Sequence, residues 1–571
     1  MRVSGDRFGF SRRAWLGRTT FAVWLTVGLG GCAAGQSPAA EPNQIGPPAN
    51  ASPSGNYLAA RQAERMRDHA MAAKFLDKAV ADDPANFELL TRAHAAMIND
   101  GRFAEAVELA RRILAVSQGN PSAQLTLAVD AIAKRNFEEA QARFEGVPLA
   151  GVNRVVAPLV IAWLAAAKNQ PAAALNALRP LNEVEGFRPL HDYHAGLLSE
   201  YAGRRDAASD YLSRAATVEG GAPSRIVSVA GAYFERIGRP DEAKAIYDKN
   251  QFRRNEDDPR LVAIATPLEG IAEAFFDVAA ALRQDNSAHL SLTYARLALA
   301  VQPSMGDALL LVAEILEQQR RREEALALYG RVDPRTSAGW TAGLRMAETL
   351  HALDRTDEAL ALLDRMAAER PERVDPLLVK GQILRIKERF AEAVRAYDTA
   401  LARVKQVERR HWSVFYARGI AHERAKQWAQ AEADFVRALE LEPDQPDVLN
   451  YLAYSWVDRG MHYDRARTML DRAVAQRPNS GHIVDSLGWV LYRTGKYEEA
   501  VPVLERAVEL QPEDPVLLDH LGDAYWRVGR ELEAQFQWRR SLGNKPDAEL
   551  KSSLERKLKD GLPTSTSQRE N

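Results

Sequence analysis

Residues 484–504, VDSLGWVLYRTGKYEEAVPVL, decide the fold of this chain of 571 residues. The stretch reads as two amphipathic helices joined at Gly495, with Gly488 on the first and Ala500 and Leu504 on the second. Small side chains let two helices approach closely, and Leu504 places a large apolar side chain one turn beyond Ala500. The stretch therefore predicts a tight helix-turn-helix hairpin.

The small residue at Ala500 recurs along the chain, mostly in steps of 34 residues, with one long step of 48 between Ala243 and Ser291. Its fourteen copies are Ala72, Ala106, Ala140, Ala174, Ala208, Ala243, Ser291, Ala325, Ala359, Ala393, Ala431, Ala466, Ala500 and Ala534. An apolar or aromatic residue follows each copy four positions later, and Gly or Ala precedes most copies by twelve positions. The fixed phase predicts one repeated hairpin.

This pattern resembles the tetratricopeptide (TPR) family, whose unit of 34 residues has Gly or Ala at its eighth position, Ala at its twentieth and a large apolar residue at its twenty-fourth. Family prolines near position 32 are matched by Pro84, Pro303, Pro371, Pro443, Pro478, Pro512 and Pro546. The resemblance covers residues 57–559. It implies an all-α fold, a right-handed α-solenoid of about 14 TPR helix-turn-helix repeats, in which stacking between units supplies the stability.

The only cysteine, Cys32, follows a segment typical of exported proteins. Arg12, Arg13 and Arg18 precede the apolar run TTFAVWLTVGLGG at residues 19–31, which is too short to span a bilayer of about 30 Å. The run and Cys32 resemble the lipobox of bacterial lipoproteins. The resemblance implies that Cys32 carries a diacylglycerol and an acylated amino group, which anchor the chain to a membrane.

Two further features bear on export. Residues 11–16, SRRAWL, are similar to a twin-arginine signal, with Trp15 where the family usually has Phe, so both the twin-arginine and the general route stay open. Ala33 and Ala34 follow Cys32, whereas Asp after the cysteine retains such lipoproteins in the inner membrane. The sequence thus predicts a protein of the cell envelope, lipid-anchored to the outer membrane and facing the periplasm.

The predicted boundaries are a signal peptide at 1–31, the lipid anchor and a flexible linker at 32–56, an N-terminal TPR array at 57–251, an insertion at 252–267, a C-terminal TPR array at 268–546, and a capping helix and tail at 547–571. We expect the insertion to divide the array into two segments, either as an elongated loop or as a hinge or partner contact. Asp547 is positioned to cap the amino terminus of the last helix.

Composition and motifs argue against an enzyme. The 75 Lys and Arg balance 77 Asp and Glu, so no positive field favours nucleic acid. The sequence has no phosphate-binding glycine loop, nucleophile elbow or metal-ligand spacing, which predicts no catalytic residue, no cofactor and no metal. His482 and Asp485, three residues apart on one helix, and the neighbours Asp519 and His520 are interpreted as structural or contact pairs.

In the TPR family, positions 2, 5, 9, 12 and 13 of the first helix of each unit line a concave groove that binds proteins. Carried onto this chain, the rule selects Asn450, Tyr454, Asp458, His482, Asp485, Trp489, Tyr492, Arg493, Asp519, Asp523, Trp526 and Arg527. Trp489 and Trp526 either contact a partner or fill gaps between units. Position 5 carries Tyr416 and acidic or amide residues, so the basic clamp that some TPR domains close on a terminal carboxylate is missing.

The run at 451–456 with those at 484–495 and 519–530 is similar to bacterial TPR lipoproteins of the cell envelope. Some of these are adaptors that bind a periplasmic carboxyl-terminal processing protease and present cell-wall hydrolases to it, which implies such partners here. The alternatives are a scaffold in envelope assembly, serving pili, polysaccharide or outer-membrane proteins, and a peptidoglycan-binding module that uses Trp489 and Trp526.

Overall fold

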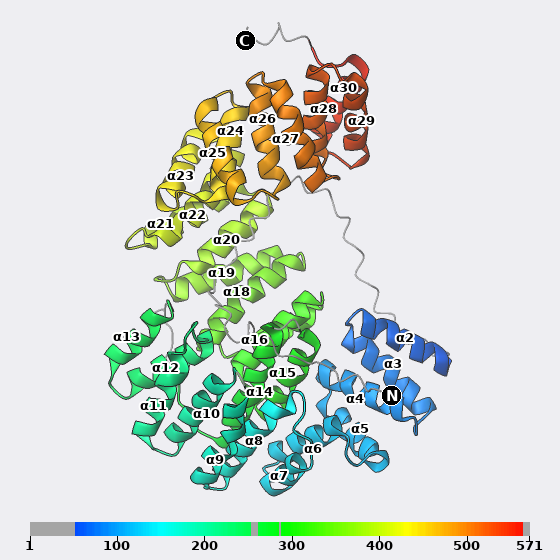
Figure 1. Ribbon diagram of the computed structural model, residues 1–571, viewed down its shortest axis with the longest axis vertical. Coiled ribbons are helices and arrows are strands. Elements are labelled where there is room, and N and C mark those ends of the chain that lie inside the picture. Colours follow the sequence, from blue (N-terminus) through cyan, green and yellow to red (C-terminus); the bar gives the residue numbers. More distant parts are fainter. Residues whose placement is uncertain (1–51, 185, 253–260, 285–286, 564–571) are drawn as a thin grey trace. The chain divides into compact units, whose positions relative to one another are not determined.

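The computed structural model describes residues 52–563 except 185, 253–260 and 285–286. Within these ranges the chain is all-α, with 29 α-helices and no strand (Figure 1). In chain order the helices form fourteen consecutive pairs, α2–α3 to α28–α29, followed by α30. Each of the fourteen small residues lies on the second helix of its pair, so the predicted TPR solenoid is confirmed.

The described chain divides into two compact units between residues 362 and 363, inside α19. Unit 1 contains α2 (Pro53–Arg65), α3 (His69–Asp82), α4 (Phe87–Asp100), α5 (Phe103–Val116), α6 (Pro121–Ala133), α7 (Phe137–Glu145), α8 (Asn153–Ala167), α9 (Pro171–Ala177), η1 (Arg179–Glu183), α10 (Arg188–Tyr201), α11 (Arg205–Ala216), α12 (Ser224–Arg236), α13 (Pro240–Lys249), α14 (Pro267–Gln284), α15 (Ala288–Val301), α16 (Gly306–Gln318), α17 (Arg322–Tyr329), α18 (Ser337–Ala352) and the start of α19 (Thr356–Glu369).

Unit 2 contains the end of α19, α20 (Asp375–Ile386), α21 (Phe390–Arg403), η2 (Arg409–His411), α22 (Trp412–Arg424), α23 (Trp428–Leu441), α24 (Pro446–Asp458), α25 (Tyr463–Gln476), α26 (Gly481–Arg493), α27 (Tyr497–Leu510), α28 (Pro515–Arg527), α29 (Glu531–Gly543) and α30 (Ala548–Asp560).

The division between the two compact units lies inside α19 and not at residues 252–267. Helices that follow the insertion pack against helices that precede it: α14 lies against α8, and α15 lies beside α4 and α6 (Figure 1). Unit 1 therefore joins repeats from both sides of residues 252–267 in one core. Of the insertion itself, residues 253–260 lie outside the described residues.

The close crossing of the two helices in a hairpin rests on the small residues. All fourteen copies of the marker residue are buried. A Cβ added at Gly488 would lie 2.6 Å from the Leu504 side chain, and one at Gly522 would lie 2.5 Å from Nε1 of Trp538. The glycine of the first helix thus faces the large apolar residue of the second, as the phase of the repeat predicted.

The two ends of the array differ in how well their boundaries were predicted. The first helix begins at Pro53, four residues before the expected start at residue 57, because the hydroxyl of Ser52 caps it by accepting from the Gly55 amide at 3.1 Å. At the other end Asp547 accepts from the Leu550 amide at 2.8 Å and begins α30, as expected. Cys32 and the signal segment lie outside the described residues.

Candidate functional site

The predicted groove residues lie on three neighbouring first helices of unit 2: α24, α26 and α28. Helix α26 contacts both α24 and α28, so the set forms one continuous surface, here called the first-helix face (Figure 1). Local sequence fixes each helix. For α28, the Asp514 carboxylate accepts from the amides of Val516 and Leu517 at 2.9 and 3.2 Å, Pro515 occupies the first turn, and Gly529 follows the end with φ of 79°.

An aromatic stack runs across α26 and reaches α28. The Trp489 ring lies 4.8 Å from the Tyr492 ring at an interplanar angle of 9°, and 3.9 Å from the His520 ring at 13°. Because His520 belongs to the next repeat, Trp489 fills the space between two repeats. The residue is only half-buried, although Nε1 of its ring is buried and has no hydrogen-bond partner among the described residues.

His520 is held by a carboxylate 35 residues away. Its Nδ1 lies 2.9 Å from the Asp485 carboxylate, and both side chains are buried. Burial disfavours the charged ring, but the contact with Asp485 and the nearby charges of Asp519 and Asp523 outweigh it and raise the pKa of His520. The predicted pairing of Asp485 with His482 is wrong, because Asp485 faces the neighbouring repeat.

Helix α30 covers the groove positions of the last repeat. Lys557, which sequence reasoning did not single out, donates to Asp519 at 2.7 Å and to Asp523 at 2.9 Å, and Asp523 also accepts from Nε1 of Trp538 at 3.0 Å. Burial, and next the charge of Asp519, raise the pKa of Asp523 to about 6. These two groove carboxylates are therefore engaged by the chain itself.

The segment after α30 lies on the remaining groove positions of the last repeat. A Cβ added at Gly561 would lie 2.2 Å from the ring of Trp526, and Arg527 donates to the carbonyl oxygen of Pro563 at 2.7 Å. Trp526 also packs on Trp538, with ring centroids 5.4 Å apart. The tryptophan thus fills a gap between helices and at the same time supports an irregular segment of main chain.

The other groove positions are less occupied. Asn450 is 5% exposed and its Oδ1 has no hydrogen-bond partner among the described residues. Tyr454 is half-buried, and burial together with the charges of Asp485 and Asp458 raises its pKa. Arg493 donates only to the main-chain oxygen of Asp458, at 3.4 Å, and no ion pair in the described chain involves its guanidinium.

His482 completes the predicted set. It is half-buried, and its Nε2 lies 3.9 Å from the Asp514 carboxylate that caps α28. That distance exceeds a hydrogen bond, so His482 is positioned loosely at the edge of the first-helix face.

The corresponding face of unit 1 is filled by the chain. Arg225 on α12 pairs with Glu273 on α14 at 2.8 Å, and Tyr193 on α10 donates to the same carboxylate at 2.8 Å. His194 lies 3.0 Å from the Asp277 carboxylate, also on α14. Because α14 buries these polar groups, the first helices α10 and α12 do not offer them to a guest. Sequence reasoning missed the network, since its partners lie 48 to 83 residues apart.

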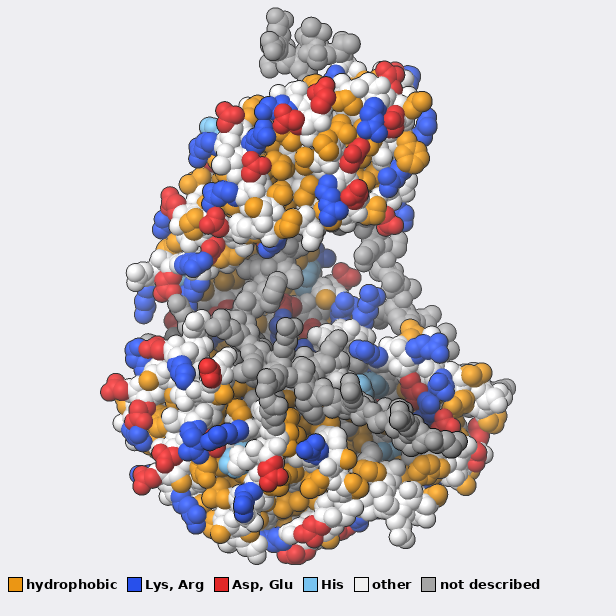
Figure 2. Space-filling model, viewed as in Figure 1, with side chains coloured by type: hydrophobic (Ala, Val, Ile, Leu, Met, Phe, Trp, Pro, Cys, Tyr) orange, Lys and Arg blue, Asp and Glu red, His pale blue; other side chains and the backbone are white. Residues whose placement is uncertain are grey.

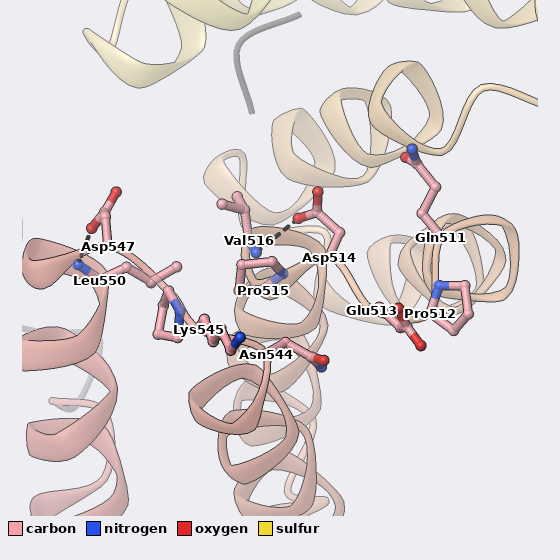
Figure 3. A pocket seen from close by; sticks show the side chains of 11 residues that line it. Gln511, Pro512, Glu513, Asp514, Pro515, Val516, Asn544, Lys545, Asp547 and Leu550 are labelled. Carbon is pink, nitrogen blue, oxygen red and sulfur yellow. Dashed lines mark hydrogen bonds between the residues drawn. The ribbon is translucent and has the colours of Figure 1, made fainter. Parts of the chain in front are cut away.

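A depression of about 510 Å³ lies between the α27–α28 and α29–α30 turns (Figure 3). Its lining residues are Gln511, Pro512, Glu513, Asp514, Pro515, Val516, Asn544, Lys545, Pro546, Asp547 and Leu550. Its two aspartates already cap α28 and α30, as the dashed lines of Figure 3 show. It is a furrow between turns rather than a site for chemistry.

The described residues were also compared with the patterns expected for a charged patch, a metal site and a membrane-spanning helix. Figure 2 shows acidic and basic side chains interspersed over the visible face. Over the described ranges, no group of three or more His, Cys, Asp or Glu residues could hold a metal ion. None of the helices in those ranges combines the length and apolar character that a membrane crossing demands.

Known proteins resemble parts of the chain. Models described as "Tetratricopeptide repeat" match residues 97–160, 344–408, 412–445 and 458–515. TPR repeat-containing protein PA4667 of Pseudomonas aeruginosa is 30% identical over 186 residues, which are 32% of this chain and 31% of the relative. The match thus spans less than a third of that relative's length.

Two solved structures illustrate the likeness. One is YrrB, a TPR protein with an unusual peptide-binding site, at 19% identity, a TM-score of 0.28, and coverage of 34% of this chain and 97% of that one. The other is the APC/C hetero-tetramer Cut9-Hcn1, at 15% identity, a TM-score of 0.38, and coverage of 90% and 96%.

Proposed function

We propose that the chain is a tetratricopeptide repeat protein that serves as a non-enzymatic scaffold and binds other proteins through the first-helix face of unit 2. TPR proteins characteristically bind protein partners. We place the binding surface on α24 and α26, because α14 covers the polar groups of α10 and α12 in unit 1, and α30 with the segment after it covers α28.

One observation carries this assignment: the protein's own segment 561–563 lies on the last repeat as an extended guest would. Gly561 covers Trp526, and Arg527 donates to a main-chain carbonyl. Exactly one repeat earlier, 34 positions back, Tyr492 and Arg493 carry the same aromatic and guanidinium pair. A ring with few torsions to freeze and a guanidinium without an ionic partner are the groups that contribute most to protein interfaces.

For the role in the cell, the sequence motifs at the amino terminus support a lipid anchor on Cys32 in the outer membrane. Runs such as 484–495 support an adaptor that holds a periplasmic carboxyl-terminal processing protease together with its cell-wall hydrolase substrates. Anchoring confines the scaffold and its partners to one membrane surface, and a scaffold that holds enzyme and substrate together raises their effective concentration.

The test is affinity capture of the full-length lipoprotein after crosslinking in its own envelope, with mass spectrometry of the captured proteins. Protease and hydrolase recovered together support the adaptor role. Recovery of pilus, polysaccharide or outer-membrane assembly proteins instead favours the envelope-assembly scaffold, and sedimentation with purified sacculi favours peptidoglycan binding.

Two charge reversals locate the surface. Arg493→Glu should abolish capture, because it repels the groups that Arg493 would bind. Arg437→Glu on the second helix α23 is the matched control, since Arg437 is 45% exposed and pairs with Glu440 within its own helix. Equal capture by both variants would remove the first-helix face from the proposal. For the anchor, Cys32→Ser should abolish palmitate labelling and membrane association.

A further inference from the structure

Helix α30 and the segment 561–563 lie on the part of the first-helix face that α28 contributes. Lys557 of α30 contacts the groove carboxylates Asp519 and Asp523. The main chain at Gly561 lies against the ring of Trp526, another groove residue. The chain therefore places one of its own helices where the groove rule expects a partner.

The contact of Lys557 has the geometry of an ammonium site. Its Nζ lies 2.7 to 2.9 Å from all four carboxylate oxygens of Asp519 and Asp523. A lysine ammonium has three N–H donors and concentrates its charge at one atom, so it fits between two carboxylates. Asp523 also accepts from Nε1 of Trp538 on α29 at 3.0 Å. The Asp523 carboxylate is thus held in place by α29 as well as by α30.

Helix α30 itself contributes little to the core. Among its residues 548–560, all of which the structure describes, only Leu554 is fully buried. Leu550 and Leu558 are partly buried against the same apolar cluster. By comparison, α28 buries its residues 517–525 without a break. Segments with few buried apolar side chains open first, so α30 is the element of the last repeat that separates most readily.

The role of an end cap explains only part of this arrangement. A repeat array needs a cap with a polar outer face, and the three leucines of α30 cover apolar surface as such a cap does. A cap does not require a lysine on two groove carboxylates, because Asp519 and Asp523 would be solvated on an open groove. The contacts of Lys557 are those of a guest.

We infer that the first-helix face of α28 is a second binding surface, and that α30 is its exchangeable occupant. The partner that fits is an amphipathic helix with a leucine and, three residues later, a lysine, as Leu554 and Lys557 stand in α30. Such a helix binds by replacing α30. The surface that it gains adjoins α26, because Arg527 lies 3.4 Å from the Tyr492 hydroxyl. This inference goes beyond the surface proposed on α24 and α26.

The test measures binding of a fluorescein-labelled peptide with the sequence of residues 547–563 to the full chain by fluorescence anisotropy. In the wild type the peptide competes with the tethered α30, whose effective concentration is on the order of millimolar, so binding should be weak. Lys557→Glu in the chain places a third carboxylate against Asp519 and Asp523. It should raise the affinity for the peptide by about tenfold or more.

Two further chain variants complete the comparison. Lys551→Glu is the matched control, because it makes the same charge reversal at an exposed position of α30 and should bind the peptide as the wild type does. Leu554→Glu loosens α30 by an independent route, since Leu554 is fully buried, and should also tighten peptide binding. A peptide that carries Lys557→Met lacks the ammonium and should bind at least about tenfold more weakly to both loosened chains.

Hydrogen exchange of α28 is measured in the same variants. Equal peptide binding by the wild type and both loosened chains would overturn the inference, as would equal binding of the two peptides. Loss of α28 protection in both loosened chains would also overturn it, because α30 would then be a fixed part of the repeat. None of these results bears on the α24–α26 surface, which Arg493→Glu tests without involving α30.

Discussion

Substituting Gly522 by Ala tests the close helix crossing on which every repeat depends. The added Cβ would lie 2.5 Å from Nε1 and 2.6 Å from Cδ1 of Trp538. Unstrained contacts between such atoms are about 3.5–4 Å, so the overlap is about 1 Å. Trp538 is fully buried and bonded to Asp523 at 3.0 Å, and it cannot turn away without losing that bond.

The magnitude follows from three opposing effects. Overpacking in a filled core costs about 1–3 kcal/mol, and weakening the hydrogen bond from Trp538 costs about 0.5–1.5 kcal/mol. Replacing glycine by alanine within a helix stabilises the helix by about 1 kcal/mol, because alanine has the higher helix propensity. We therefore expect Gly522→Ala to destabilise the last repeat by roughly 0.5–3.5 kcal/mol.

The assay is native-state hydrogen exchange of the amides in α28 and α29, because repeat arrays open locally. Gly543→Ala in α29 is the control: its Cβ would meet no atom within 4 Å, so it should leave protection unchanged or raise it. If Gly522→Ala protects the two helices as well as Gly543→Ala does, the glycine is not what allows the helices to nest.

Three further predictions concern buried charges. At pH 7, Lys557→Met leaves Asp519 and Asp523 buried without their cation, so the packing of α30 should weaken by about 3–5 kcal/mol. Lys557→Arg keeps the positive charge and is the control. Unchanged hydrogen exchange in α30 of Lys557→Met would contradict this prediction. Because the pKa of Asp523 is raised to about 6, the folded protein keeps a proton that the unfolded chain releases near pH 4. Stability should fall by up to roughly 3 kcal/mol as the pH rises from about 4 to about 6, and Asp523→Asn should flatten that part of the melting profile. Arg225→Met should destabilise unit 1 by about 3–5 kcal/mol, because it leaves the buried Glu273 carboxylate without its cation. In urea unfolding, adding Glu273→Leu to Arg225→Met should restore part of the lost free energy of unfolding. If the double variant is no more stable than Arg225→Met, the ion pair is not the cause.

The repeated hairpin could be predicted because its cause is local. A small residue about every 34 positions is needed where two adjacent helices cross. Asp547 indicates the start of a helix because its own side chain caps the amino terminus. The start at Pro53 was missed because a run rich in Pro, Ser and Asn resembles a linker, although Ser52 and Pro53 are also good helix starters.

The parts that could not be predicted depend on contacts between distant repeats. Packing of α14 on α8 joins helices that are not neighbours in the chain, and the 34-residue phase does not indicate such a contact. The site shows the same limit: the groove rule placed Asp485 and Asp519 on one face, but their partners, His520 and Lys557, lie 35 and 38 residues away. The periodic pattern predicts on which face of the repeats a side chain lies, but it does not predict with which residue that side chain forms a hydrogen bond or an ion pair.

The most direct test of a protein-binding first-helix face is photo-crosslinking in intact cell envelopes with benzoylphenylalanine in place of a single residue. Asp458, exposed at the end of α24, reports on the face, and Val436, 37% exposed on the second helix α23, reports on the opposite side of its hairpin. The account predicts a discrete protein adduct from position 458 and none from position 436. No adduct from position 458, or the same adducts from both positions, would contradict it.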